Sequence, residues 1–244
     1  DSIVWDTLLT MLGLVEAGCT PESTPELEKA IDWILDQQVL VEGDWSLTVK
    51  SVAPGGWAFE RANLHYPDCD DTALAILVLR QVRSHLEEDA PCRQRINEAV
   101  RRGETWLRAM QSKNGGWGAF DRDNNNRLAA KIPFADFGEM LDPPSVDVTA
   151  HAVEAILADL VESDSADPMQ DQDVARAVRY MLDEQEPDGS WFGRWGVNHI
   201  YGTGSVLPAL RAAGLPSEHP ALLKAGRWFQ SHQNEDCGWG ETPG

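Results

Sequence analysis

The sequence predicts an all-α fold, an α/α barrel (toroid) that is built from repeated helix pairs and only partly contained in this chain. Hydrophobic residues recur at helical spacing through nearly all of the 244 residues, with Gly-, Pro- and Asn-rich interruptions and no convincing alternating strand. A motif of an aromatic residue, a Gln and a Trp recurs four times. The helices between these motifs also begin with similar residues, so each repeat is expected to be one pair of helices.

The predicted helices alternate along the chain between an inner and an outer member of each pair. In order, their ranges are Val4–Ala17, Pro25–Gln38, Asp70–Arg83, Arg93–Gln111, Asp147–Leu160, Asp173–Gln185, Tyr201–Ala213 and Pro220–Gln233. The inner helices begin alike, with Trp5-Asp6-Thr7, Asp70-Asp71-Thr72, Asp147-Val148-Thr149 and Tyr201-Gly202-Thr203. Four pairs are fewer than a closed barrel of this kind contains. Because the chain also opens without Met, we expect it to be part of a longer protein, with residues 1–244 forming one partial barrel domain.

Each outer helix ends on the repeated motif. An aromatic residue lies five positions before a Gln, and a Trp follows six or seven positions after it. The Gln amide can satisfy free carbonyls at the helix end or bond to the backbone of the next pair, while the Trp packs over the junction. We call each Gln with its Trp a staple. The predicted staples are Gln38 with Trp45, Gln111 with Trp117, Gln185 with Trp191, and Gln233 with Trp239.

Three of the ten tryptophans lie outside these motifs. Trp5, Trp57 and Trp195 are placed beside the starts of inner helices or in a loop that leads to one. We therefore predict that these three rings line a cavity, whereas the other seven are structural.

A cluster of three carboxylates, Asp68, Asp70 and Asp71, marks the start of one inner helix. One or two Asp residues in a first turn are ordinary caps. Three of them repel one another when ionised and partly buried, which raises the pKa of at least one. The cluster therefore predicts either a metal site or a carboxylic acid that keeps its proton. Inner-helix starts share one end of a barrel, so His151, one turn beyond Asp147, is expected beside this cluster.

Composition excludes some classes of function. The formal net charge of −20 argues against nucleic acid as a partner and against electrostatic docking on anionic lipid. The longest strictly apolar run, residues 73–79, is too short to span a bilayer, and no signal-peptide pattern is present. Four cysteines without a CxxC pair favour reduced thiols in a cytosolic compartment.

The segment DCDDTA at residues 68–73 resembles the DxDDTA motif of squalene–hopene cyclases, and the staples resemble the Gln-Trp repeats of that triterpene cyclase family. Three more stretches are similar: NGGWGAFDRDN (114–124), PFADFGEMLDPPSVDVTAH (133–151) and GSWFGRWGVNHIYGTG (189–204). The resemblance covers essentially the whole chain. It implies the second half of a monotopic membrane enzyme, an isomerase that folds squalene in a closed cavity and releases hopene, with hopanol as a side product.

The resemblance also implies roles for individual residues. Asp70 matches the proton donor, Asp68 and Asp71 its flanking acids, and His151 the histidine that hydrogen-bonds the donor. The supporting acids are Asp6 and Asp147, and Tyr201 links the cluster to water. Aromatic positions that line the family's cavity match Trp5, Phe59, Phe120 and Trp195. The constriction at the cavity entrance matches Phe134, Ala135 and Phe137.

Two positions depart from the family pattern. Phe120 stands where Tyr is best known, so a hydroxyl is missing from the cavity wall. Ala135 stands where Cys is often seen in the entrance constriction. These departures bear on product fidelity and on the shape of the substrate entrance, and not on the acid.

The residues suit this chemistry. Protonation of an unactivated alkene needs a carboxylic acid, and a cationic His151 that donates to Asp70 stabilises the carboxylate left behind. Aromatic faces stabilise each carbocation by about 0.5–2 kcal/mol without trapping it. Neither a metal nor a cofactor is required by this scheme.

Three alternatives remain open. A zinc-dependent α/α barrel could use Asp68, Cys69 and a His, although the usual Asp-x-Cys spacing is absent. A non-catalytic toroid that binds protein partners would explain the staples only. A cyclase of oxidosqualene or of a longer terpene is the third, but the family's oxidosqualene enzymes carry a single acid, so the extra acids favour squalene. The expected partners are squalene and the cytoplasmic face of the bacterial membrane, and a homodimer is left open.

Overall fold

The computed structural model describes residues 2–61, 63, 65–125, 141–158 and 167–242. These residues form helices joined by turns and loops, and their only β pairing consists of isolated bridges. The α-helices are α1 (Ile3–Glu16), α2 (Pro25–Asp36), α3 (Cys69–Arg83), α4 (Pro91–Ala109), α5 (Val146–Leu157), α6 (Gln172–Asp183), α7 (Asn198–Ala212) and α8 (Pro220–Ser231). Two short 3₁₀ helices that the sequence did not predict are η1 (Asp44–Leu47) and η3 (Pro168–Gln170).

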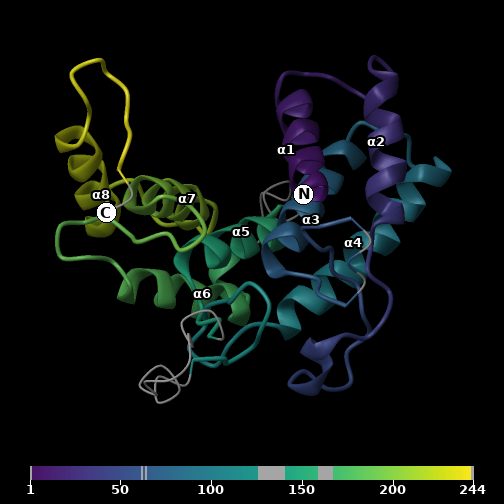
Figure 1. Ribbon diagram of the computed structural model, residues 1–244. Helices are drawn as coiled ribbons and strands as arrows, with labels where there is room; N and C mark the ends of the chain where they lie inside the picture. The colour runs from purple at the N-terminus through teal and green to yellow at the C-terminus, as the bar shows by residue number, and fades with distance from the viewer. Residues whose placement is uncertain (1, 62, 64, 126–140, 159–166, 243–244) are drawn as a thin grey trace. The chain divides into compact units, whose positions relative to one another are not determined.

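The chain forms two compact units. Unit 1 consists of residues 1–110 and 119–122, and unit 2 of residues 111–118 and 123–244. Each unit contains two helix pairs, α1 to α4 in unit 1 and α5 to α8 in unit 2 (Figure 1). Among the described residues, no helix combines the length and the apolar character of a membrane span.

The inner helices pack against each other within each unit. In unit 1, α3 contacts both α1 and its own partner α4, and in unit 2, α5 contacts both α7 and its partner α6. Helix α3 is buried on almost all sides, from Cys69 at its first position to Val82 near its end. The outer helices α2, α4 and α8 each begin at a Pro, whose fixed φ and missing N–H suit a first helical turn. The predicted alternation of inner and outer helices is confirmed.

Each staple Gln lies two residues beyond the end of its outer helix, rather than in its last turn as predicted. Three of them donate Nε2–H to two carbonyls, one in the loop that follows and one in the next outer helix. Gln38 donates to Gly55 O and Ala99 O, both at 2.8 Å. Gln111 donates to Gly115 O and Asp173 O, and Gln185 to Gly189 O and Ala221 O. Of the two predicted modes, bonding to the next pair is therefore confirmed.

The tryptophan of the first staple is Trp57, not Trp45. The Trp57 indole N–H donates to Ile34 O at 2.8 Å, four residues before Gln38. Trp191 and Trp239 donate to the carbonyls four residues before their own Gln in the same way. Trp45 lies instead in η1, where its ring packs edge-on against Trp106 at 5.8 Å between centroids. An insertion between Gln38 and Gly55 displaces the true staple beyond the spacing of the other copies.

A threonine ties each of three staples to an inner helix. The backbone N–H of Trp57 donates to Thr72 Oγ1 at 2.8 Å, that of Trp117 to Thr149 Oγ1 at 3.0 Å, and that of Trp191 to Thr203 Oγ1 at 2.9 Å. All three threonines are fully buried, Thr72 and Thr149 in the first turns of α3 and α5, and Thr203 in the second turn of α7. These hydrogen bonds explain why the inner helices begin with similar residues. The same helix starts carry candidate site residues.

Candidate active site

The three acids of the cluster occupy different environments at the start of α3. Asp68 is the N-cap residue and is 3% exposed. Its Oδ1 accepts from Asp71 N at 2.7 Å and its Oδ2 accepts from Phe59 N at 3.0 Å. Asp71 is 2% exposed, and its Oδ1 has no hydrogen-bond partner among the described residues. Asp70, between them in the first turn, is only half-buried.

Burial raises the pKa of the two outer acids of the cluster. It raises the pKa of Asp68 well above its ordinary value, and the negative charge of Asp71 adds to this effect. Burial also raises the pKa of Asp71 to about 7, although a hydrogen bond with the Asp68 side chain acts in the opposite direction. Repulsion from Asp70 contributes to both increases. The start of α3 therefore keeps at least one carboxylic acid near neutral pH, as the sequence predicted.

The start of α3 is fixed by the segment after the second staple. Cys69 N donates to Ala119 O at 2.7 Å, two residues beyond Trp117. On the other side, Asp68 N donates to Trp57 O at 2.9 Å. The Cys69 side chain is fully buried. Backbone contacts thus hold the acid cluster from both neighbouring staple loops.

In unit 2, Asp147 joins the start of α5 to an aromatic residue of the predicted cavity wall. It is 0% exposed, and its Oδ2 accepts from Trp195 N at 2.8 Å. Its Oδ1 has no hydrogen-bond partner among the described residues. The fully buried Asp147 side chain holds the backbone of Trp195 and thereby positions this aromatic residue within unit 2.

His151 and Tyr201 come together in unit 2. Their rings meet edge-on with centroids 6.4 Å apart, His151 from α5 and Tyr201 from the first turn of α7. Two glycines leave room for the Tyr201 ring, because a Cβ at Gly193 would lie 2.8 Å from Tyr201 Cδ1 and one at Gly196 would clash with the ring outright. The sequence analysis predicted no role for these glycines, and the available signal was their close spacing before the Tyr.

Glu154 is a further carboxyl that the sequence analysis did not single out. It lies on α5, three residues after His151, and burial raises its pKa while the charge of His151 lowers it. The spacing of three places both side chains on one face of the helix, which was the sequence signal for their proximity.

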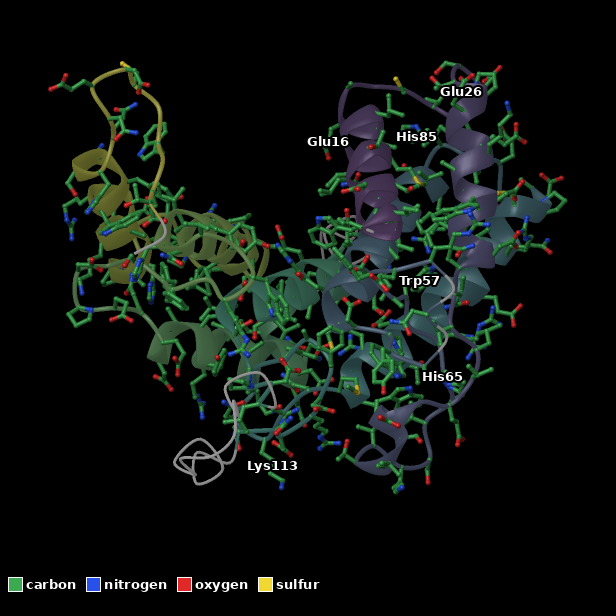
Figure 2. The ribbon with its side chains drawn as sticks, viewed as in Figure 1. Glu16, Glu26, Trp57, His65, His85 and Lys113 are labelled. Carbon is green, nitrogen blue, oxygen red and sulfur yellow. The ribbon has the colours of Figure 1, made fainter. Side chains whose placement is uncertain are left out.

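The predicted wall residues fall into three groups. Phe59, Phe120 and Trp195 have 41%, 37% and 49% of their surface exposed, and the Arg194 guanidinium lies over the Trp195 ring, 5.9 Å from its centroid. Trp5 is half-buried in α1. Trp57 is 0% exposed and lies among the packed side chains of unit 1 (Figure 2), so the prediction that it lines a cavity is wrong. Its ring is needed to complete the first staple.

Other predicted positions are not brought together by the structure. Asp6 is exposed on α1, where it accepts from Ser2 Oγ at 2.7 Å. Phe134, Ala135 and Phe137, the predicted constriction, lie outside the described residues. Asp70 belongs to unit 1 and His151 to unit 2, and the two units are described separately, so the pairing of these residues stays a prediction.

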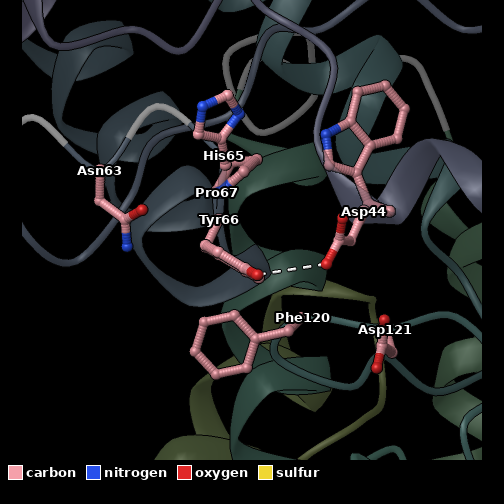
Figure 3. Close-up of a pocket in the computed structure, with 8 residues that line it drawn as sticks. Asp44, Asn63, His65, Tyr66, Pro67, Phe120 and Asp121 are labelled. Carbon is pink, nitrogen blue, oxygen red and sulfur yellow. Dashed lines mark hydrogen bonds between the residues drawn. The ribbon is translucent and has the colours of Figure 1, made fainter.

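Unit 1 contains a cavity of about 430 Å³ (Figure 3). Phe120 and Pro67, the residue before Asp68, both line it. Across it, the Tyr66 hydroxyl donates to Asp44 Oδ2 at 3.2 Å, and the carboxylate raises the pKa of Tyr66. Phe120 therefore lines an open space together with Pro67, which directly precedes the acid cluster in the chain. Within the described residues, no group of three or more His, Cys, Asp or Glu side chains is arranged to hold a metal ion.

These observations can be compared with known proteins. The family model described as the squalene-hopene cyclase C-terminal domain matches residues 1–244. The chain belongs to this family. Its acid cluster and aromatic positions therefore lie in a chain of the family that the sequence motifs resemble.

Individual relatives agree with this membership. The squalene–hopene cyclase of Zymomonas mobilis is 44% identical over 244 residues, which cover 99% of this chain and 35% of the relative. That of Alicyclobacillus acidocaldarius is 47% identical over 213 residues, covering 87% of this chain and 32% of the relative. The chain therefore spans about a third of the length of these curated relatives.

A solved structure shows the fold. A variant of the type II terpene cyclase MstE from Scytonema, in complex with geranylgeranyl dihydroxybenzoate, superposes with a TM-score of 0.56 at 19% identity. The match covers 95% of this chain and 55% of that one. The helix pairs accordingly belong to the α/α-toroid fold of terpene cyclases, as the repeats predicted.

Proposed function

We propose that this chain supplies the proton-donating acid and part of the aromatic wall of a class II triterpene cyclase that converts squalene to hopene. One observation carries the proposal. In a chain of the squalene-hopene cyclase family, buried Asp68 and Asp71 have raised pKa values on either side of half-buried Asp70. Such a cluster retains a carboxylic acid near neutral pH, which is what protonation of an alkene requires.

In the proposed reaction, Asp70 transfers its carboxyl proton to a terminal double bond of squalene, and the electron pair of that bond forms the new C–H bond. The resulting tertiary carbocation is attacked by the next double bond, and repeated attack closes the rings. Loss of a proton from the last cation to water gives hopene, and return of a proton from water to Asp70 restores the acid, so the net reaction is an isomerisation. Addition of water to the same cation, followed by loss of a proton to a second water, gives hopanol as a side product. His151, donating to Asp70, would stabilise the carboxylate between turnovers.

The aromatic residues have a separate role in this proposal. Phe59, Phe120 and Trp195 would present ring faces to the successive cations, each contributing about 0.5–2 kcal/mol. Their exposed ring surface supports this assignment. Because an aromatic face forms no lasting bond to a carbocation, the rings stabilise intermediates and let cyclisation continue.

The setting of the enzyme follows from its substrate. Squalene is an apolar polyprenoid that resides in lipid, so we propose that the whole protein works as a monotopic enzyme at the cytoplasmic face of the bacterial membrane. The net charge of −20 in this part of the chain favours apolar contact with lipid over electrostatic contact. A homodimer stays a prediction.

The first test is Asp70→Asn in the full-length protein, with Asp89→Asn, an exposed position of the same unit, as the matched control. Asn is nearly isosteric with Asp but has no acidic proton. We expect Asp70→Asn to abolish formation of hopene and hopanol from squalene, measured by gas chromatography with mass spectrometry, and Asp89→Asn to behave as wild type. Turnover above a few per cent in folded Asp70→Asn would refute the donor assignment. If the wild-type enzyme prefers oxidosqualene to squalene, the proposed substrate is wrong and oxidosqualene takes its place.

A further inference from the structure

A carboxylate in the last staple loop caps the helix that carries Tyr201. Glu241 lies two residues after Trp239, and its side chain is 21% exposed. Its Oε2 accepts from two backbone N–H groups of α7, Asn198 N at 2.9 Å and Ile200 N at 2.8 Å. Its Oε1 lies 3.8 Å from His199 Nδ1.

Helix α7 depends on this contact because its own cap residue supplies no acceptor. The cap position is Val197, which has no side-chain oxygen, and no side-chain cap bond is formed there. The first N–H groups of a helix have no partner within the helix, and a negative charge at this end interacts favourably with the helix dipole. Glu241 provides both the acceptor and the charge from 41 residues further along the chain.

The residue after Ile200 is Tyr201, so this cap acts next to the site. The Tyr201 ring is confined by Gly193 and Gly196 on one side and meets His151 at 6.4 Å. The same segment is tied to α7 a second time, since Gly193 N donates to Asn198 O at 3.0 Å. A shift of the first turn of α7 would therefore move the Tyr201 ring relative to His151.

Two other inner helices, α3 and α5, are held in a comparable way. Ala119 O, two residues after Trp117, accepts from Cys69 N at the start of α3, and Trp195 N, four residues after Trp191, donates to Asp147 near the start of α5. In each case the loop after the next staple fixes the turn that bears a candidate site residue. At α7 this task falls to a single ionisable side chain, so one substitution can remove it.

We propose that Glu241 is a positioning residue of the cyclase, which fixes the first turn of α7 and thereby holds the Tyr201 hydroxyl in place at the acid end of the site. This inference rests on the proposed function. It assigns the fourth staple a role in catalysis and not only in packing.

The test is a double-mutant cycle in the full-length protein with squalene as substrate. It compares Glu241→Ala, Tyr201→Phe and the double variant, with Glu235→Ala, an exposed acid of the same loop, as control. Misplacement of a site group by about 1 Å costs up to about a hundredfold in rate, so we expect Glu241→Ala to lower kcat by roughly tenfold to a hundredfold with little change in KM. Glu241→Gln should restore most of the activity, because its Oε1 can accept from the same N–H groups.

The cycle separates positioning from a purely structural role. If Glu241 acts through Tyr201, Glu241→Ala should have little further effect on kcat in the Tyr201→Phe background. Equal fold losses in both backgrounds, an unchanged kcat in Glu241→Ala, or a silent Tyr201→Phe would overturn the inference. If Glu241→Ala does not unfold cooperatively, Glu241→Asp, which withdraws the carboxylate from the two N–H groups by one methylene, is compared in the same two backgrounds with the same criteria. A wild-type protein that leaves squalene unchanged would overturn the proposed function, and this inference with it.

Discussion

Asp68 is subject to two opposing demands at the start of α3. As the cap residue it accepts two backbone N–H groups, from Asp71 and Phe59, and such bonds favour the ionised carboxylate. Its burial favours the neutral acid and has the larger effect, since the pKa is raised overall. The same side chain therefore helps to begin the helix and helps to keep a proton beside Asp70.

A raised pKa has a measurable consequence for stability at Asp71. Its pKa is about 7 in the folded protein, against about 3.9 for an ordinary unfolded Asp. Between these values the folded state holds a proton that the unfolded state has released. The free energy of unfolding contributed by this group should therefore fall as the pH rises from about 4 to about 7.

Asp71→Asn cannot ionise and should escape this loss. We expect the full-length variant to gain stability relative to wild type on moving from about pH 5 to about pH 8, by on the order of a few kcal/mol. Thermal unfolding at both pH values measures the difference, with Glu22→Gln, an exposed acid of unit 1, as the control. Parallel pH dependence in wild type and Asp71→Asn would show that Asp71 is ionised in the folded state throughout this range.

At the scale of elements, the staples explain how helix pairs connect. Gln38 follows α2, and its amide reaches both the loop at Gly55 and the next outer helix at Ala99, while Arg102 donates to its Oε1 from α4. The staple loop in turn bonds the inner helix through Thr72. One motif therefore joins two outer helices and one inner helix, which a helix-end cap alone would not do.

Removal of a staple amide should cost more than removal of an exposed amide outside the staples. Gln38→Ala takes away the Nε2 donor of two carbonyls and one acceptor of Arg102 in a buried region, which is expected to cost about 2 kcal/mol. Gln94 is the matched control, because it is exposed on α4 and belongs to no staple. The thermal midpoint of the full-length protein should fall for Gln38→Ala and hardly change for Gln94→Ala. Equal shifts would argue that the bonds to the next outer helix contribute nothing.

At the scale of the whole molecule, the proposed chemistry requires both units. The acid cluster belongs to unit 1, whereas His151, Asp147, Tyr201 and Trp195 belong to unit 2. No single helix pair holds a complete set of acid, hydrogen-bond donor and aromatic wall.

His151→Ala tests whether the two units cooperate. If His151 donates to Asp70, its loss should lower kcat by roughly a hundredfold without abolishing turnover, because the carboxylate formed on proton transfer loses a stabilising hydrogen bond while the donor residue itself remains. Product formation from squalene by the full-length enzyme is the measurement, and His85→Ala, exposed in unit 1, is the control. An unchanged rate in His151→Ala would show that this residue of unit 2 takes no part in the proton transfer.

The sequence by itself determined the features that depend on local order. Helical periodicity predicted eight helices within a few residues of their observed bounds, and the recurring Gln predicted where outer helices end. The acid cluster was visible because three carboxylates within four residues repel one another wherever they are placed. These features could be predicted because hydrophobic spacing and charge density act over a few neighbouring positions.

Only the tertiary structure decided which distant groups meet. Spacing assigned Trp45 to the first staple, but the hydrogen bond to Ile34 O assigns Trp57, because a loop insertion leaves the three-dimensional contact intact while it changes the distance along the chain. The partners of Asp147 and Glu241 lie more than forty residues away. A hydrogen bond across such a separation depends on how helices pack, and no local pattern of residue types specifies it.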